Sequence, residues 1–84
     1  MSVAEKEKRI KEKFLMEFGE HLKAIRKSKG LTAAEVSRRM DIDKPNYTRI
    51  ESGRINPSLF VLRKISTCLD ISLEELFKGF KNKK

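Results

Sequence analysis

The first half of the chain carries apolar side chains at helical spacing, separated by charged residues. The apolar positions follow one another every three or four residues: Phe14, Phe18, Leu22 and Ile25, with Leu15 alongside. Such a pattern predicts an amphipathic helix that buries one face. Gly30 follows a last turn rich in lysine and arginine and can adopt the left-handed conformation that ends a helix, so the first helix is expected to stop there.

Charged residues dominate positions 1–13, where Ile10 continues the apolar stripe backwards. The pairs Glu5–Arg9 and Glu7–Lys11 are spaced to interact along a helix, each contributing about 0.2–0.5 kcal/mol. Residues 1–13 are therefore interpreted as a charged N-terminal extension, which either continues the first helix or frays. We assign the main domain to residues 14–78 and a basic tail to residues 79–84.

Capping residues and turns divide the rest of the chain into further helices. Thr32 and Glu35 have the spacing of a capping box, in which each side chain accepts a hydrogen bond from the other residue's amide. This box opens a second helix, which is followed by a three-residue turn over Asp41–Asp43. The last residue of that turn is a good N-cap for a third helix over about Lys44–Ser52.

Two more helices are expected after the loop that follows Gly53. The fourth begins with a cap at Asn56 or Ser58. Its predicted apolar face consists of Leu59, Leu62, Ile65 and Leu69, flanked by Val61 and Cys68. Ser72 and Glu75 repeat the capping-box spacing and open a short fifth helix. No segment has the alternation of a strand, so the predicted fold class is all-α with five helices.

Length and composition limit the class of protein. A chain of 84 residues allows one small core, because it buries only about 60–65% of its surface on folding. Cys68 is the single cysteine, which excludes a disulfide within the chain and suits a reducing compartment. The N-terminus is charged where a signal peptide needs an apolar stretch, and the longest apolar run is only Leu59–Leu62. A soluble, cytoplasmic protein without a membrane partner is expected.

The charge is strongly basic and unevenly distributed. Twenty lysines and arginines against twelve acidic residues leave a net charge of +8, and residues 1–30 and 78–84 each carry an excess of four basic groups. This balance favours a polyanionic partner such as nucleic acid or an anionic lipid surface. The alternative is that the charge serves solubility alone.

The second and third predicted helices, joined by their three-residue turn, describe a helix-turn-helix. Tyr47 and Ile50 are expected to face the core. The opposite face of the third helix then presents Lys44, Pro45, Thr48 and Arg49. Such a helix fits the major groove of duplex DNA, which is about 12 Å wide, and its side chains can reach base edges. The alternative is an ordinary solvated helix face.

The stretch from Phe18 to Phe77 resembles the Cro/phage-repressor-like (XRE-type) family of helix-turn-helix transcriptional regulators. The matching pieces are Arg26, Gly30, Leu31 and Thr32, "IESG" at 50–53, "NPS" at 56–58 and "LDISLEELF" at 69–77. The resemblance implies a five-helix, repressor-like DNA-binding domain over residues 14–78 whose third helix reads the major groove. It also implies a homodimer on a pseudo-palindromic operator. Ala33 departs from the family, replacing a glutamine that commonly contacts phosphate, and Tyr47 stands where an aliphatic residue is usual.

The resemblance also implies roles for individual residues. Arg26 and Glu51 match a pair that commonly forms an ion pair beneath the recognition helix. Arg54 and Asn56 lie in the loop that usually contacts the DNA backbone in this family.

The start of the second helix and the turn after it offer two further contacts. Thr32 and Ala33 begin a helix whose N-terminal amides suit a phosphate group. Asp43 could accept a hydrogen bond from a cytosine amino group, although a plain N-cap is the simpler interpretation.

Other chemistry is not suggested by the sequence. It contains no nucleophile–base constellation, phosphate-cradling glycine loop or metal-ligand cluster, so no enzyme activity, cofactor, metal or small-molecule ligand is expected. His21 stands alone and is expected at the surface. The ends carry more apolar residues than so small a domain needs: Ile10, Phe14, Phe77 and Phe80. Either Phe80 folds back on its own helix end or the terminal helices form a dimer seam.

The function predicted is that of a sequence-specific regulator that binds double-stranded DNA. A phage-type repressor, a restriction-modification controller and an antitoxin that represses its own operon all remain open within this class. The alternative from another class is a protein-interaction module of the same fold with only weak affinity for DNA.

Overall fold

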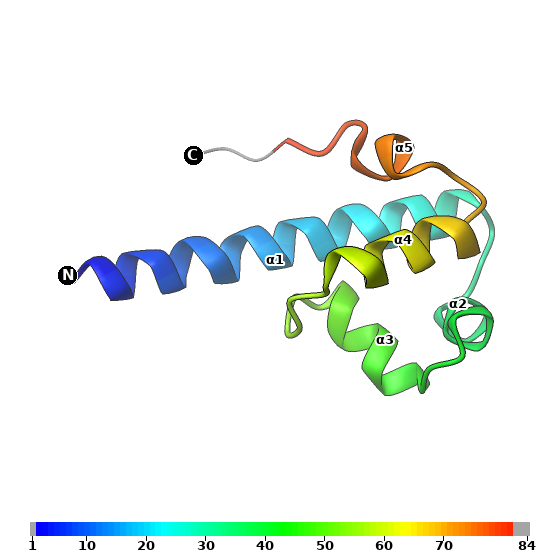
Figure 1. Ribbon diagram of the computed structural model, residues 1–84, viewed down its shortest axis with the longest axis horizontal. Coiled ribbons are helices and arrows are strands. Elements are labelled where there is room, and N and C mark those ends of the chain that lie inside the picture. The colour runs from blue at the N-terminus through cyan, green and yellow to red at the C-terminus, as the bar shows by residue number, and fades with distance from the viewer. Residues whose placement is uncertain (1, 82–84) are drawn as a thin grey trace.

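The computed structural model describes residues 2–81 and consists of helices joined by short connections (Figure 1). The helices are α1 (Val3–Ser28), α2 (Ala33–Met40), α3 (Lys44–Glu51), α4 (Leu59–Cys68) and α5 (Leu73–Phe77). No strand occurs within residues 2–81, and the predicted all-α, five-helix fold is confirmed. Residues 82–84 of the predicted basic tail lie outside the described part of the chain.

α1 runs the length of the molecule, whose longest dimension is 41 Å (Figure 1). It begins directly after Ser2, which forms a capping box with Glu5, so the charged extension continues the helix. Every residue from 2 to 13 is exposed, and these turns project beyond the other helices. Only the second half of α1 therefore packs on the core.

The core lies where the second half of α1 meets the other four helices. Its buried apolar side chains are Phe18, Leu22, Val36, Met40, Tyr47, Ile50, Ile65, Leu69 and Leu76. α1 packs against α3, α2 packs against both α3 and α4, and α4 packs against α5. Each helix supplies at least one of these side chains, so the position of α3 depends on all the others.

The helix starts follow the predicted caps with one exception. The capping boxes of α2 and α5 are present, and Ser58, not Asn56, caps α4. Asp43 is the N-cap residue of α3, as predicted, but its side chain does not accept the expected capping hydrogen bond. Pro45 has no amide to donate, and the Asn46 amide already donates to the Asp43 carbonyl at 3.0 Å.

The first turn of α4 also departs from the prediction. Leu59, expected to face the core, is 74% exposed, and its neighbour Phe60 is 68% exposed. α2 and α5 pack beside the second half of α4, where Ile65 and Leu69 are buried. The first turn of α4 lies beyond these partners. Helical periodicity alone therefore predicted a core-facing position for Leu59, which the structure shows to be exposed.

The chain after α5 returns along α1. The Phe80 ring packs edge-on against Phe14 and Phe18, with ring centroids 5.6 and 5.5 Å apart. His21, expected at the surface, is partly buried beside the Phe80 ring, and its Nε2 donates to the Leu76 carbonyl oxygen at 2.8 Å. Of the two alternatives for Phe80, the structure shows the ring folded back on the domain.

Gly19 lies where α1 crosses the end of α3, and it has no room for a side chain. A Cβ at this position would lie 2.1 Å from the Glu51 carbonyl oxygen. Gly53 approaches α1 nearby, since a Cβ there would lie 2.7 Å from the Met16 backbone nitrogen. α1 and the end of α3 therefore meet backbone to backbone, a contact that the sequence pattern did not predict.

Replacing Gly19 with Ala is expected to destabilise the fold by about 3 kcal/mol or more, because the added carbon meets backbone that cannot move aside. At an exposed helical position the same change would stabilise by about 1 kcal/mol. Gly30→Ala is the control, because Gly30 has φ +72° but no atom lies within 4 Å of an added Cβ. Its cost should stay at roughly 1–2 kcal/mol, the penalty for a left-handed conformation alone. Denaturant unfolding measures both, and equal losses would contradict the close contact.

Candidate nucleic-acid interface

The turn between α2 and α3 sets the angle between these helices. Asp41 has φ +57°, in the left-handed region, and ends α2. The Ile42 amide donates to the Ser37 carbonyl at 3.0 Å, and the Ile42 side chain packs on the core. The helix-turn-helix predicted from the sequence is therefore present.

α3 has a buried face and an exposed face. The buried residues are Tyr47, Ile50 and Glu51. The predicted base-reading residues lie away from the core: Lys44, Pro45 and Arg49 are exposed, and Thr48 is half-buried. Asn46 and Ser52 are exposed as well, and neither was predicted from the sequence to belong to the exposed contact face. The signal for Asn46 was its spacing of three residues from Arg49, which brings two helical side chains together.

Two side-chain hydrogen bonds order the exposed face of α3. Arg49 Nη1 donates to Asn46 Oδ1 at 2.7 Å, which holds the guanidinium beside the helix. Thr48 Oγ1 donates to the Pro45 carbonyl oxygen at 3.0 Å. With its proton engaged in this way, the Thr48 hydroxyl is left as an acceptor towards any partner.

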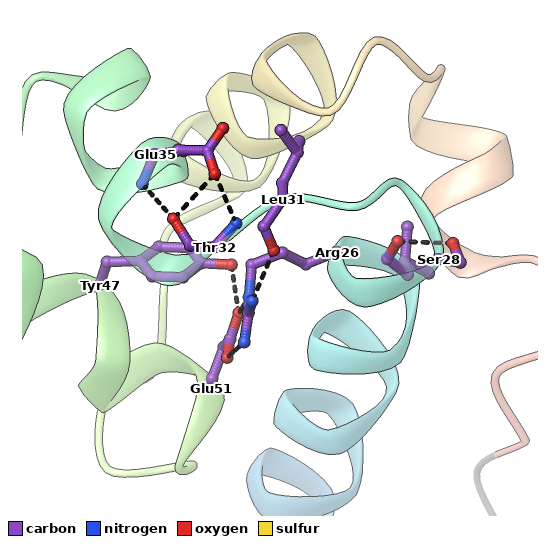
Figure 2. A network of polar contacts seen from close by, with 8 residues as sticks. Arg26, Ser28, Leu31, Thr32, Glu35, Tyr47 and Glu51 are labelled. Atoms are coloured by element: carbon purple, nitrogen blue, oxygen red, sulfur yellow. Dashed lines mark hydrogen bonds and ion pairs between the residues drawn. The ribbon is translucent and has the colours of Figure 1, made fainter.

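A buried ion pair lies beneath this face (Figure 2). Arg26 Nε lies 2.7 Å from Glu51 Oε2, and Arg26 Nη2 lies 3.0 Å from Glu51 Oε1, which makes the pair bidentate. Arg26 Nη1 donates to the Leu31 carbonyl at 2.7 Å, and the Tyr47 hydroxyl donates to Glu51 Oε2. One network thus joins α1, the link to α2, and α3.

The environment of this network shifts the pKa of two of its members. The hydrogen bond to Glu51 raises the pKa of the Arg26 guanidinium, despite the opposing effect of burial. Burial, and then the hydrogen bond to Glu51, raises the pKa of the Tyr47 hydroxyl far above its ordinary value. Tyr47 stands where the family usually has an aliphatic residue, and its phenol is accommodated there because the Glu51 carboxylate, one turn later, accepts its hydrogen bond.

The start of α2 borders α3 and holds the residues predicted to bind phosphate. Glu35 accepts hydrogen bonds from the Thr32 amide and hydroxyl at 3.2 and 3.0 Å, and these hold the pKa of the Glu35 carboxyl below its ordinary value. An acidic group therefore lies close to the expected phosphate position. Ala33 is half-buried and, with Thr48 and Lys23, lines a hollow of about 290 Å³ between α1, α2 and α3.

The loop between α3 and α4 carries the other two predicted phosphate contacts. Arg54 and Asn56 are both exposed there. They follow Gly53, whose φ of +79° turns the chain away from the axis of α3. The structure therefore places them beside the exposed face of α3 and not on it.

Residues 2–81 contain no group of three or more histidine, cysteine or acidic side chains placed to hold a metal ion. None of the helices described here is both long enough and apolar enough to span a membrane. Cys68 is half-buried, and burial raises the pKa of its thiol.

Comparison with known proteins identifies the family. Residues 22–76, more than half of the chain, match the family described as helix-turn-helix. The chain belongs to this family of XRE-type helix-turn-helix regulators. The regulator is 42% identical over 67 residues to YqaE of Bacillus subtilis (strain 168), described as an uncharacterized HTH-type transcriptional regulator. That match covers 80% of this chain and 58% of YqaE, so the chain spans little more than half of that relative.

Two further relatives are control proteins. The regulator is 44% identical over 61 residues to control protein C.MunI of a Mycoplasma species, covering 71% of this chain and 82% of C.MunI. Its fold is similar to the crystal structure of the restriction-modification controller protein C.AhdI from Aeromonas hydrophila, with a TM-score of 0.71 and 35% identity. The structural match covers 75% of this chain and 96% of C.AhdI. The family and the fold inferred from the sequence are confirmed.

Removing one member of the buried ion pair should strongly destabilise this helix-turn-helix regulator. Glu51→Ala leaves the Arg26 guanidinium buried without its counter-ion and is expected to cost about 3–5 kcal/mol of unfolding free energy. A double-mutant cycle with Arg26→Met and Glu51→Gln should give a coupling of about 1–3 kcal/mol in denaturant unfolding. A coupling near zero would show that the two charges act independently.

Alkaline titration should reveal the buried phenol. Tyr47 is the single tyrosine and the chain has no tryptophan, so tyrosinate absorbance reports on this residue alone. Because folding raises its pKa, the stabilisation from the protonated phenol is complete below about pH 10, the ordinary tyrosine value, and is lost as the pH rises further. Tyrosinate is expected to appear only as the protein unfolds.

Tyr47→Phe is the control for this titration, and it should lose the tyrosine component of the alkaline destabilisation. A tyrosinate signal at about pH 10 in protein that is still folded would contradict the buried hydrogen bond.

Proposed function

We propose that this regulator binds specific sequences of double-stranded DNA with α3, over about Lys44–Ser52, in the major groove. The observation that carries the proposal is the two-sided character of α3. One side is held to α1 through the Arg26–Glu51 pair, and the other exposes polar side chains. A helix whose rotation is fixed in this way presents the same side chains to a groove about 12 Å wide.

Base contacts are assigned to the residues Lys44, Pro45, Thr48 and Arg49. Arg49 is the leading candidate for a specific contact, since a guanidinium can bond O6 and N7 of a guanine together. Its bond to Asn46 uses one donor only, and an arginine has about five. Lys44, at the helix start, can serve a guanine or a phosphate. The methyl group of Thr48 suits the methyl group of a thymine.

Phosphate contacts are assigned to the residues Thr32, Ala33, Arg54 and Asn56, on the two sides of α3. The first-turn amides of α2 and the helix dipole attract an anion, and the hollow beside Ala33 leaves room for one. The net charge of +8 adds an attraction for the DNA backbone that does not depend on sequence.

We further propose that the regulator acts as a homodimer on a pseudo-palindromic operator. One α3 reaches only a few base pairs, and two copies would read half-sites about 34 Å apart, one helical turn of DNA. Similarity to C.MunI and C.AhdI favours the role of a restriction-modification controller over the other two roles. The proposed place of action is the cytoplasm, without cofactor or small-molecule ligand.

Two substitutions should distinguish contacts with the bases from contacts with the DNA backbone. Arg49→Ala is expected to relax preference at one or two operator positions and to cost about 1–3 kcal/mol on the preferred site. Arg54→Ala should weaken binding to all sequences almost equally and lower the salt slope by about one unit. Both variants are measured on an operator selected from random duplexes and on a scrambled duplex, over a salt series.

Two results would overturn this assignment. If Arg49→Ala weakens both duplexes by the same factor while Arg54→Ala changes the preferred sequence, the reading face is misplaced. If the wild type shows only weak binding that is indifferent to sequence, the protein is an interaction module and not a sequence-specific regulator.

A further inference from the structure

Asn46 lies on the exposed side of α3, three residues before Arg49. Its Oδ1 accepts a hydrogen bond from Arg49 Nη1 at 2.7 Å. A guanidinium group carries donors only, so the amide atom that faces it is the carbonyl oxygen and not the nitrogen. The bond therefore fixes which way round the Asn46 amide is held, and it leaves the two hydrogens of Nδ2 on the other branch of the amide.

This orientation changes the base that the asparagine suits. An unengaged asparagine pairs with adenine, since Oδ1 accepts from the N6 amino group while Nδ2 donates to N7. In Asn46 the oxygen already serves Arg49, and a second donor bound to it would lie beside the cationic guanidinium, donor against donor. Guanine presents two acceptors, O6 and N7, at its major-groove edge. The hydrogens of Nδ2 therefore suit guanine better than adenine.

We propose that Asn46 is a specificity-determining residue, which reads guanine in preference to adenine at the base pair next to the one that Arg49 reads. The inference rests on the proposed function, because α3 must lie in the major groove. Residues three apart on a helix are separated by about 4.5 Å along its axis, close to the roughly 3.4 Å between successive bases of one strand. The two side chains act as one unit, and the site on the DNA is expected to contain two neighbouring guanines.

The charge of this unit favours the same base. Arg49 keeps about four N–H groups besides the one that it donates to Asn46, and its guanidinium is positively charged. Adenine and cytosine each place an amino donor in the major groove, where guanine places acceptors. Thr48 has the opposite polarity on the same face, because its proton is donated to the Pro45 carbonyl oxygen at 3.0 Å. Bonds within the helix thus make Asn46 a donor and Thr48 an acceptor towards DNA.

Selection of bound duplexes from a random pool tests the proposal on the wild type, Asn46→Ala, Arg49→Ala and Arg54→Ala. The wild type is expected to prefer guanine over adenine about fivefold or more at two adjacent positions. Asn46→Ala should lose this preference at one of the two positions. Arg49→Ala should lose it at the other and, because Oδ1 is released, change the Asn46 position from guanine to adenine.

Arg54→Ala is the matched control, since it also removes one exposed arginine but leaves the bond between Asn46 and Arg49 in place. It should weaken binding and keep both guanines, which shows that the change in Arg49→Ala does not follow from loss of charge alone. Thermal unfolding of Asn46→Ala should stay close to that of the wild type, because the side chain is exposed. A changed base preference in that variant then reports on reading and not on folding.

Three results would overturn the proposal. They are adenine in place of guanine at the Asn46 position of the wild type, failure of adenine to replace guanine there in Arg49→Ala, and an Asn46→Ala profile that changes only at the Arg49 position or nowhere. A wild type that still selects a defined operator leaves the proposed function intact in each case. A wild type that selects no sequence would overturn the proposed function together with this inference.

Discussion

A buried cation must have its donors satisfied, and the Arg26 guanidinium imposes this requirement on the whole domain. Its side chain is 9% exposed, so it needs the Glu51 carboxylate and the Leu31 carbonyl in place before folding can be favourable. Desolvation offsets much of the attraction in such a pair, so its main effect is geometric. It permits one rotation of α3 about its axis, and that rotation decides which side chains meet solvent.

α1 holds the end of α3 in two ways at once. The Gly19 backbone leaves no space for a Cβ against the Glu51 carbonyl, and two turns later Arg26 binds the carboxylate of that same residue. Backbone contact sets how close the helices lie, and the ion pair sets how α3 is turned. Neither contact alone would define both quantities.

Helical periodicity and capping spacing were sufficient to predict five helices and the buried faces of α1, α2 and α3, because both depend on short-range order. Leu59 and His21 were misplaced because burial depends on which helix lies opposite, and that is a property of the assembled fold. Asp43 failed as a side-chain cap because a proline removed one donor and its own carbonyl took the other. For the candidate site, the exposed side of α3 followed from Tyr47 and Ile50, whereas the contact of Asn46 with Arg49 and the approach at Gly19 depend on three-dimensional detail.

The separation of the two faces of α3 has a consequence for how such a protein diversifies. Lys44, Pro45 and Arg49 belong to no part of the core, so other side chains can replace them without a cost in packing. Tyr47, Ile50 and Glu51 carry the structural requirements of the same helix. If α3 reads DNA as proposed, the scaffold can therefore be retargeted to new sequences by exchanging its outer residues, in evolution or by grafting, while the folded frame stays unchanged.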